Sequence, residues 1–218
     1  MNAAEHPFQF YTAAYLTRIG NQKASNLAEL RRDLEGSSDA SIFYHTYQSL
    51  SRHHFLTEGF SNDFAQWVLA ACNRPRLAEE MASLDIRDYV ALAGLRADLL
   101  RVVKDFCLAH PKESELNAFE PFYFCEAIEI PIPLGLEVRT LREFHDSLGE
   151  LSHSSLYYHF VSSRLRLHLR SNDFSLWLEK ELGLRALAER ANRIDIYTRT
   201  LEGIQARLMA LVEGELAK

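Results

Sequence analysis

Hydrophobic residues recur at helical spacing along most of this chain. In the segment 26–35, for example, Leu27, Leu30 and Leu34 fall on one side of a helix. The same pattern predicts helices over 26–35, 39–55, 63–71, 75–83 and 91–109, and again over 140–148, 153–169, 173–182, 184–193 and 200–216. N-caps are expected at Asn26, Asp39, Asn62, Thr140, Ser152 and Asn172, whose side chains can accept a first-turn N–H.

Two kinds of segment depart from this pattern. Glu126–Ile132 alternates in polarity and contains proline, which predicts an extended segment at a sheet edge. The openings Phe8-Gln9-Phe10 and Phe122-Tyr123-Phe124 fit either a helix or a strand.

The second half of the chain repeats the first half. Aligned pairs include Ser41 with Ser155, His45 with His159, Arg52 with Arg166, Asp63 with Asp173 and Trp67 with Trp177. We therefore expect an all-α, or nearly all-α, protein of two tandem helical repeats related by a pseudo-two-fold axis. The repeats cover 5–109 and 119–216, and the charged, proline-containing segment 110–118 is expected to link them. They can form two lobes or share one core.

The helices predicted over 39–55 and 153–169 separate into two faces on a helical wheel. The apolar face of the first holds Phe43, Tyr47, Leu50 and His54. The opposite face, which we call the polar stripe, holds Ser41, His45, Gln48 and Arg52, and the second copy repeats it as Ser155, His159, Ser162 and Arg166. Hydroxyl, imidazole and guanidinium groups on one line can bind a phosphate or carboxylate. The alternative is an ordinary solvated helix face.

Metal and catalytic motifs are weak in this sequence. His45 and His54 lie about half a helical turn out of phase, so one helix cannot chelate a metal with both. A metal shared by His45 and His159 is geometrically feasible, but the sequence contains no HExxH pair, and we predict no metal site and no particular cofactor. The Asn-Asp-Phe-x-x-Trp motif at Asn62 and at Asn172 is interpreted as a helix start, with the aspartate favoured by the helix dipole.

Composition narrows the class of protein. Hydrophobic residues make up 47% of the 218 residues, enough to bury a core. A net charge of -6 without a basic run argues against nucleic-acid binding. The sequence has no apolar segment of membrane-spanning length and no recognisable leader, so a cytoplasmic location is expected. The three cysteines are far apart and suggest neither a disulfide framework nor a thiolate metal site.

The strings Ser41–Thr46, Arg52–His54 and Asn62–Trp67, with second copies at Ser155–His159 and Asn172–Trp177, resemble an uncharacterised bacterial family of internally duplicated proteins. The resemblance implies a duplicated fold, and members of that family sometimes lie near sugar-nucleotide glycosyltransferases or glycan-processing enzymes. It supplies no catalytic residues. Tyr47 stands where the family often has histidine, which argues against a metal cluster.

These observations favour a non-enzymatic accessory or regulatory protein that binds a protein partner or a small anionic ligand through the paired polar stripes. The alternative is an enzyme, with or without metal assistance, that acts on a phosphorylated or sugar substrate. His45 or His159 would then be the acid or base. The near-identity of the two stripes favours binding, because an active site seldom needs two identical general bases.

Overall fold

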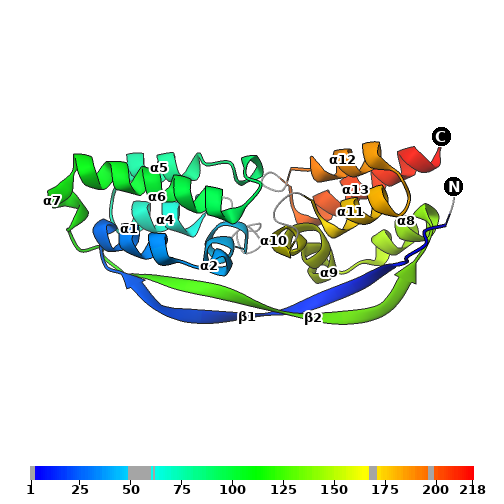
Figure 1. Ribbon diagram of the computed structural model, residues 1–218, viewed down its shortest axis with the longest axis horizontal. Helices are drawn as coiled ribbons and strands as arrows, with labels where there is room; N and C mark the ends of the chain where they lie inside the picture. The colour runs from blue at the N-terminus through cyan, green and yellow to red at the C-terminus, as the bar shows by residue number, and fades with distance from the viewer. Residues whose placement is uncertain (1–2, 49–59, 61, 167–170, 196–198) are drawn as a thin grey trace. The chain divides into compact units, whose positions relative to one another are not determined.

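The computed structural model describes residues 3–48, 60, 62–166, 171–195 and 199–218 (Figure 1). It combines helices with two long strands, β1 (Phe8–Ala24) and β2 (Phe122–Val138), which pair in a two-stranded sheet. The predicted all-α fold is therefore wrong, and the protein is mixed α/β. The extended segment predicted at Glu126–Ile132 is confirmed as part of β2.

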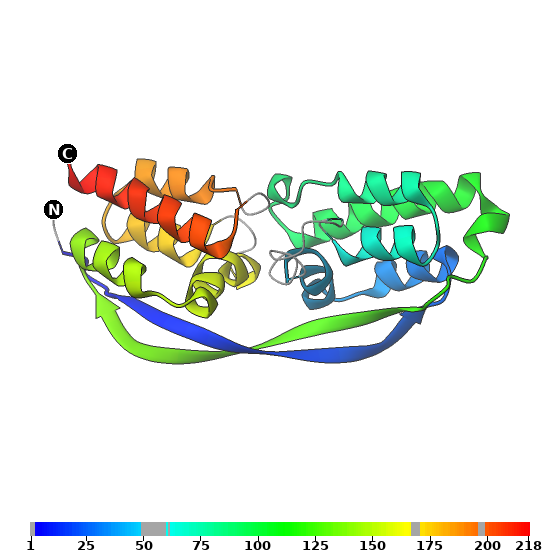
Figure 2. The same ribbon diagram turned by 180° about the vertical axis from the view of Figure 1, so that it is seen from behind.

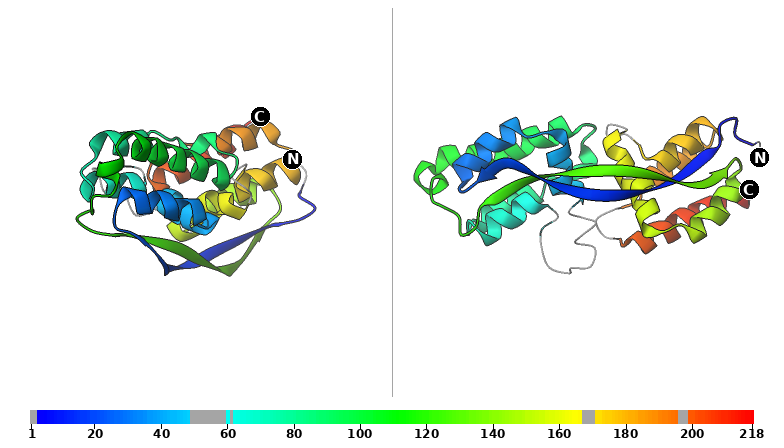
Figure 3. Two further views of the ribbon diagram at one scale, coloured as in Figure 1. Left: turned by 60° about the vertical axis from the view of Figure 1, so that its left-hand side comes forward. Right: turned by 90° about the horizontal axis from the view of Figure 1, so that it is seen from below.

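The two strands run antiparallel and lie side by side (Figure 3). The start of β1 meets the end of β2, where Gln9 Nε2 donates to Glu137 Oε1 at 2.8 Å, and further along Arg18 pairs with Glu126. Pro131 and Pro133 do not prevent this pairing. Because they are two residues apart, their nitrogens point to the same edge of the strand, and a two-stranded sheet leaves one edge of each strand open.

Contacts divide the chain into two compact units. Unit 1 comprises residues 1–14 and 129–218, and unit 2 comprises residues 15–128. Each unit therefore includes one part of β1 and one part of β2. The segment 110–118, predicted as a linker, contains the short helix α7 (Pro111–Ser114) and belongs to unit 2, where the Ala118 N–H donates to the Ser25 carbonyl at 2.7 Å.

The helices of unit 2 pack into a small bundle (Figure 1). They are α1 (Leu27–Gly36), α2 (Asp39–Phe43), η1 (Tyr44–Gln48), α4 (Asp63–Ala70), α5 (Pro75–Ala82), η2 (Ile86–Asp88), α6 (Leu92–Ala109) and α7. Helix α1 packs against α6, and α4 packs against α5. The leucines that predicted α1, Leu27, Leu30 and Leu34, are fully buried in this core.

Unit 1 has a matching set of helices (Figure 2). They are α8 (Leu141–Glu150), α9 (His153–Tyr157), η3 (Tyr158–Ser162), α10 (Ser163–Arg166), α11 (Asp173–Lys180), α12 (Arg185–Asn192) and α13 (Leu201–Leu216). Helix α8 packs against α13, and α11 packs against α12, as their counterparts do in unit 2. Among the described residues, no helix has the length and apolar character to cross a membrane.

Local hydrogen bonds explain where most helices begin. The side chains of Asn62 and Asn172 accept the backbone N–H groups of Ala65 and Ser175, at 2.8 and 2.9 Å. The N-caps predicted at Asn26, Thr140 and Ser152 are confirmed in the same way. The prediction of Asp39 as a cap is wrong, because Ser38 caps α2 instead.

The helices predicted over 39–55 and 153–169 are not regular α-helices. Each begins as a short α-helix, α2 or α9, and continues as a π-helix, η1 or η3. A π-helix bonds residue i to i+5, so a helical wheel of 3.6 residues per turn does not hold across it. In the second segment the chain returns to an α-helix, α10, after η3. Residues 49–59 and 167–170 lie outside the described part, and with them the end of each predicted helix, including Leu50 and His54.

Candidate functional site

The polar stripe does not face solvent. Ser41, His45, Ser155, His159 and Ser162 are all buried, with at most 3% of each residue exposed. Phe43 and Tyr47, on the predicted apolar face, are buried as well, so these turns are enclosed on both sides. The remaining stripe members cannot be placed: Gln48 and Arg166 are described in their backbone alone, and Arg52 lies outside the described residues.

In unit 2, the imidazole of His45 joins a helix to a strand. Its Nδ1 lies 2.9 Å from the Oδ2 atom of Asp63, the first residue of α4. Its Nε2 accepts the backbone N–H of Cys125 in β2 at 2.9 Å. The ring of Phe122, also in β2, lies 4.7 Å from the imidazole between centroids.

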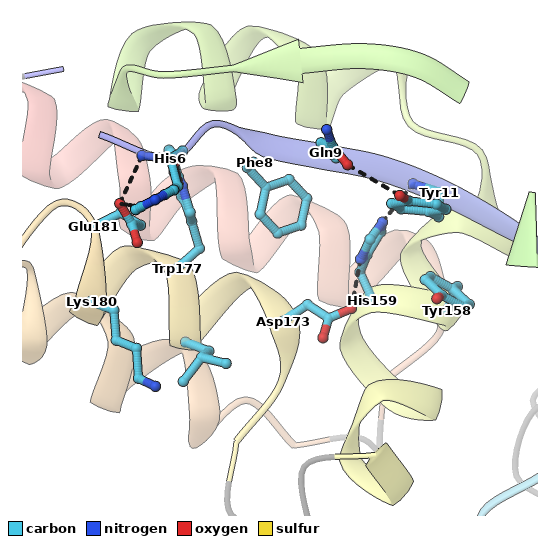
Figure 4. A pocket seen from close by; sticks show the side chains of 11 residues that line it. His6, Phe8, Gln9, Tyr11, Tyr158, His159, Asp173, Trp177, Lys180 and Glu181 are labelled. Atoms are coloured by element: carbon cyan, nitrogen blue, oxygen red, sulfur yellow. Dashed lines mark hydrogen bonds and ion pairs between the residues drawn. The ribbon is translucent and has the colours of Figure 1, made fainter. Parts of the chain in front are cut away.

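Unit 1 repeats this arrangement around His159. Its Nδ1 lies 2.8 Å from Asp173 Oδ2, at the start of α11, and its Nε2 accepts the backbone N–H of Tyr11 in β1 at 2.8 Å (Figure 4). The ring of Phe8 lies 4.9 Å from the imidazole. The Ser155 hydroxyl completes the attachment by donating to the Tyr11 carbonyl.

These contacts determine the tautomer of both histidines. A backbone N–H can only donate, so each Nε2 carries no proton. The proton of the neutral ring is therefore on Nδ1, which donates to Asp63 in one unit and to Asp173 in the other. Both ring nitrogens are thus occupied by contacts that hold the fold.

The strand segment on each histidine comes from the other sequence repeat. Phe8–Tyr11 opens the first repeat but packs on the helices of the second, in unit 1. Phe122–Cys125 opens the second repeat but packs on the helices of the first, in unit 2. The two repeats therefore exchange their opening segments within one chain.

A pocket of about 390 Å³ opens beside the histidine of unit 1 (Figure 4). His159 and Asp173 form part of its wall, and the aromatic side chains of Phe8, Tyr158 and Trp177 form much of the rest. Its polar groups are His6, Gln9, Tyr11, Lys180 and Glu181. This volume lies within the range of small-molecule sites.

Hydrogen bonds hold one rim of this pocket in place. Glu181 accepts the backbone N–H of His6 at 3.0 Å, and Trp177 Nε1 donates to the His6 carbonyl at 3.0 Å. The pKa of Glu181 is lowered mainly by that backbone N–H, and also by the His6 side chain and by the nearby charge of Lys180. Lys180 itself forms no hydrogen bond or salt bridge with another residue in the described part of the chain.

Unit 2 has a pocket at the corresponding position, but its chemistry differs. This pocket of about 240 Å³ is lined by Asp63, Trp67, Ala70, Ala71 and other residues. Trp67 Nε1 donates to the Glu120 carbonyl at 2.7 Å, as Trp177 does to that of His6. Ala70 and Ala71 stand where unit 1 has Lys180 and Glu181, so the lining of the unit 2 pocket lacks the lysine and glutamate found in unit 1.

The described ranges contain no group of three or more His, Cys, Asp or Glu side chains placed to hold a metal ion. In this described part, Nδ1 of His45 lies against Asp63 and Nδ1 of His159 against Asp173, and a backbone N–H donates to the other ring nitrogen of each.

A family of unknown function, DUF5752, matches residues 5–213, which is nearly the whole chain. The chain belongs to this family. The solved structure of OrfY from Thermoproteus tenax is similar, with 29% sequence identity and a TM-score of 0.86, covering 100% of this chain and 99% of that one. Among proteins with curated descriptions, none matches. Family membership is therefore established, and function has to be argued from the site.

Sequence reasoning did not identify several residues of this site. Asp63 and Asp173 were interpreted as helix-start residues, and they do lie in the first turns of α4 and α11, but they also bind the histidines. The signal was present, since histidine and aspartate are repeated together in both halves. Tyr11 and Lys180 carried no such signal, because only the fold brings Tyr11 to His159 and Lys180 into the lining of the same pocket.

Proposed function

We propose that this protein is a non-enzymatic accessory or regulatory protein, and that unit 1 holds a small ligand in the pocket beside His159. The observation that carries the proposal is the hydrogen bond from the Tyr11 backbone N–H to His159 Nε2. A histidine paired with aspartate at the edge of a pocket could serve as a general base through Nε2. Here that nitrogen already accepts a bond that holds β1 in place, which favours binding over acid–base catalysis.

The pocket indicates the class of ligand. Phe8, Tyr158 and Trp177 offer aromatic contacts for a flat or apolar portion. Lys180 offers a positive charge that makes no hydrogen bond or salt bridge among the described residues, and it suits one carboxylate or phosphate group. We therefore propose a small ligand that combines a ring or apolar portion with one anionic group.

A thermal-shift screen with aromatic carboxylates, sugar acids and sugar phosphates, followed by titration calorimetry, tests this site. Lys180→Ala introduces the residue found at the corresponding position of unit 2, Ala70, and should weaken binding at least about tenfold. Lys104→Ala, at an exposed lysine of α6, is the matched control and should bind like the wild type. Equal affinity in the wild type and Lys180→Ala would contradict the proposed site.

The enzyme alternative predicts a different result. Any ligand found in the screen would be converted to product, and His159→Asn would abolish that turnover while the ligand still bound. Metal analysis of protein purified without chelators belongs to the same test, because a metal-assisted enzyme needs a stoichiometric ion. Turnover that depends on His159 would overturn the non-enzymatic proposal.

A surface on β2 supports a protein partner in addition to a ligand. Ile130, Ile132, Leu134 and Leu136, which we call the aliphatic row, are each 40–45% exposed. Alternate residues of a strand share one face, so the row forms a continuous apolar strip, which is typical of protein–protein contacts. The family resemblance suggests a sugar-nucleotide glycosyltransferase as the partner.

This association is tested with a glycosyltransferase that is encoded beside a gene of this family. Its activity is measured with and without the present protein. We expect the protein to change that activity and Ile132→Asp to remove the change. Asn21→Asp, an exposed position of β1, adds the same charge and should have no effect. If Ile132→Asp acts like the wild type, the row is not the contact surface.

We further infer that the two halves descend from one duplicated unit. The order of helices is the same in both units, and each uses a histidine, an aspartate and a Phe-x-Phe strand in the same way. This supports an ancestor that paired two copies by exchanging strands.

A further inference from the structure

A second cavity in unit 1 is lined by four arginine side chains. It has a volume of about 310 Å³ and lies between the end of α12 and the facing side of α13. The arginines are Arg190, Arg193, Arg199 and Arg207. This cavity shares no lining residue with the pocket beside His159.

Most of this positive charge is uncompensated within the described residues. Arg190 pairs with Glu215 at 3.0 Å. The guanidinium groups of Arg193, Arg199 and Arg207 form no hydrogen bond or ion pair with any other described side chain. Asp195 is the one acidic residue of the lining. Such a cluster is unusual in a chain with a net charge of -6, and an anion bound among the arginines would reduce their mutual repulsion.

The first half of the chain shows that the fold does not need these arginines. The four corresponding residues of unit 2 are Glu80, Ser83, Val90 and Asp98. Helices α5 and α6 nevertheless pack as α12 and α13 do. The basic side chains are therefore an addition to unit 1 and not a requirement for packing.

We propose that this cavity binds a small soluble molecule through a phosphate or pyrophosphate group. One guanidinium group can donate two parallel hydrogen bonds to a phosphate. The three arginines around this cavity that are unpaired within the described residues therefore match a ligand group with several charged oxygens. The volume lies at the lower end of the range for small-molecule sites, which favours a compact ligand. Ile194 and Leu211, both buried, give the cavity an apolar floor for a carbon-bearing portion.

Calorimetric titration with inorganic pyrophosphate at low salt tests the proposal on the full chain. We expect the wild type to bind and Arg199→Val/Arg207→Asp, which introduces the residues of unit 2, to bind at least about tenfold more weakly. Circular dichroism checks the fold of the double variant. If the double variant does not fold, the single variants Arg199→Val and Arg207→Asp are titrated in its place. Arg142→Val, at an exposed arginine of α8, is the matched control and should bind like the wild type.

Two further arms separate a small ligand from other sources of phosphate. Vesicles containing phosphatidate and a single-stranded oligonucleotide are tested with the same variants. The proposal is supported if pyrophosphate binding depends on Arg199 and Arg207 and if neither the vesicles nor the oligonucleotide bind more tightly than pyrophosphate. It is overturned if pyrophosphate does not bind, if Arg142→Val weakens binding as much as the double variant does, or if vesicles or oligonucleotide bind more tightly through the same arginines.

Discussion

The Nε2 atom of His159 accepts the backbone N–H of Tyr11 at 2.8 Å, across 148 positions of the sequence. Through this bond and the contact with Asp173, one imidazole joins the first strand to two helical segments of the second half. His45 makes the equivalent connection in unit 2, through Cys125 and Asp63. Each unit is thus held together by a side chain that the sequence alone suggested for ligand binding.

Replacing His159 with alanine should destabilise unit 1 by about 3 kcal/mol, because the Tyr11 N–H and the Asp173 carboxylate lose a partner and a cavity remains. Urea unfolding followed by circular dichroism measures this loss. His153→Ala is the control: its side chain is 48% exposed and pairs with Glu202, so the change should stay within about 0.5 kcal/mol. A loss for His159→Ala no larger than that of the control would contradict the structural role.

Gly183 should resist substitution by residues other than asparagine or aspartate. Its φ is +69°, in the left-handed region, and a Cβ atom there would meet no other atom within 4 Å, so the cost is conformational alone. We expect Gly183→Val to lower the free energy of unfolding by about 1–2 kcal/mol. Gly183→Asn should cost less, because the corresponding residue of unit 2 is Asn73 with a φ of +53°. Equal thermal-denaturation midpoints for the two variants would refute this account.

Stability should depend on pH through Glu126. The Ser38 hydroxyl, and then the Arg18 guanidinium, donate to this carboxylate and lower its pKa. Because the pKa of Glu126 is lower in the folded state, the ionised carboxylate adds to the free energy of unfolding. This stabilisation is complete above the pKa of the unfolded chain, about 4.3, and is lost as the pH falls through the pKa of the folded state.

Glu126→Gln should therefore be less stable than the wild type at pH 7, and the difference should shrink as the pH falls below about 4. Urea midpoints measured from pH 7 to pH 3 check this. Glu79→Gln, at an exposed position of α5, should keep the wild-type profile. A Glu126→Gln difference that stays constant over this range would count against the assignment.

The Cys72 thiol should react slowly in the native protein. Burial raises its pKa from 9.0 to about 12, although Arg74 partly opposes the change. Because the thiolate is the nucleophile, alkylation by iodoacetamide at pH 8 should be roughly a thousandfold slower than in the unfolded chain. Mass spectrometry of the labelled peptide measures the rate in native buffer and in urea. Equal rates under the two conditions would show that the thiol is not protected.

The sequence by itself determined the start of many helices and the residues that they bury. Asn62 and Asn172 cap their helices through bonds to residues three positions away, and Leu27, Leu30 and Leu34 are buried at the predicted spacing. Such features depend on neighbours within one helical turn, so a local pattern is sufficient to predict them.

Only the tertiary structure decided that Phe8–Tyr11 and Phe122–Cys125 form strands and exchange places, so that each covers a histidine of the other repeat. It also decided that the polar face of His45 is buried, because a face becomes interior or exterior according to what packs on it. The same holds for Arg190, Arg199 and Arg207. They are separated in the sequence and form no basic run, and the packing of α12 and α13 brings them to one cavity. Contacts between residues far apart in the chain depend on the whole fold, and no local period encodes them.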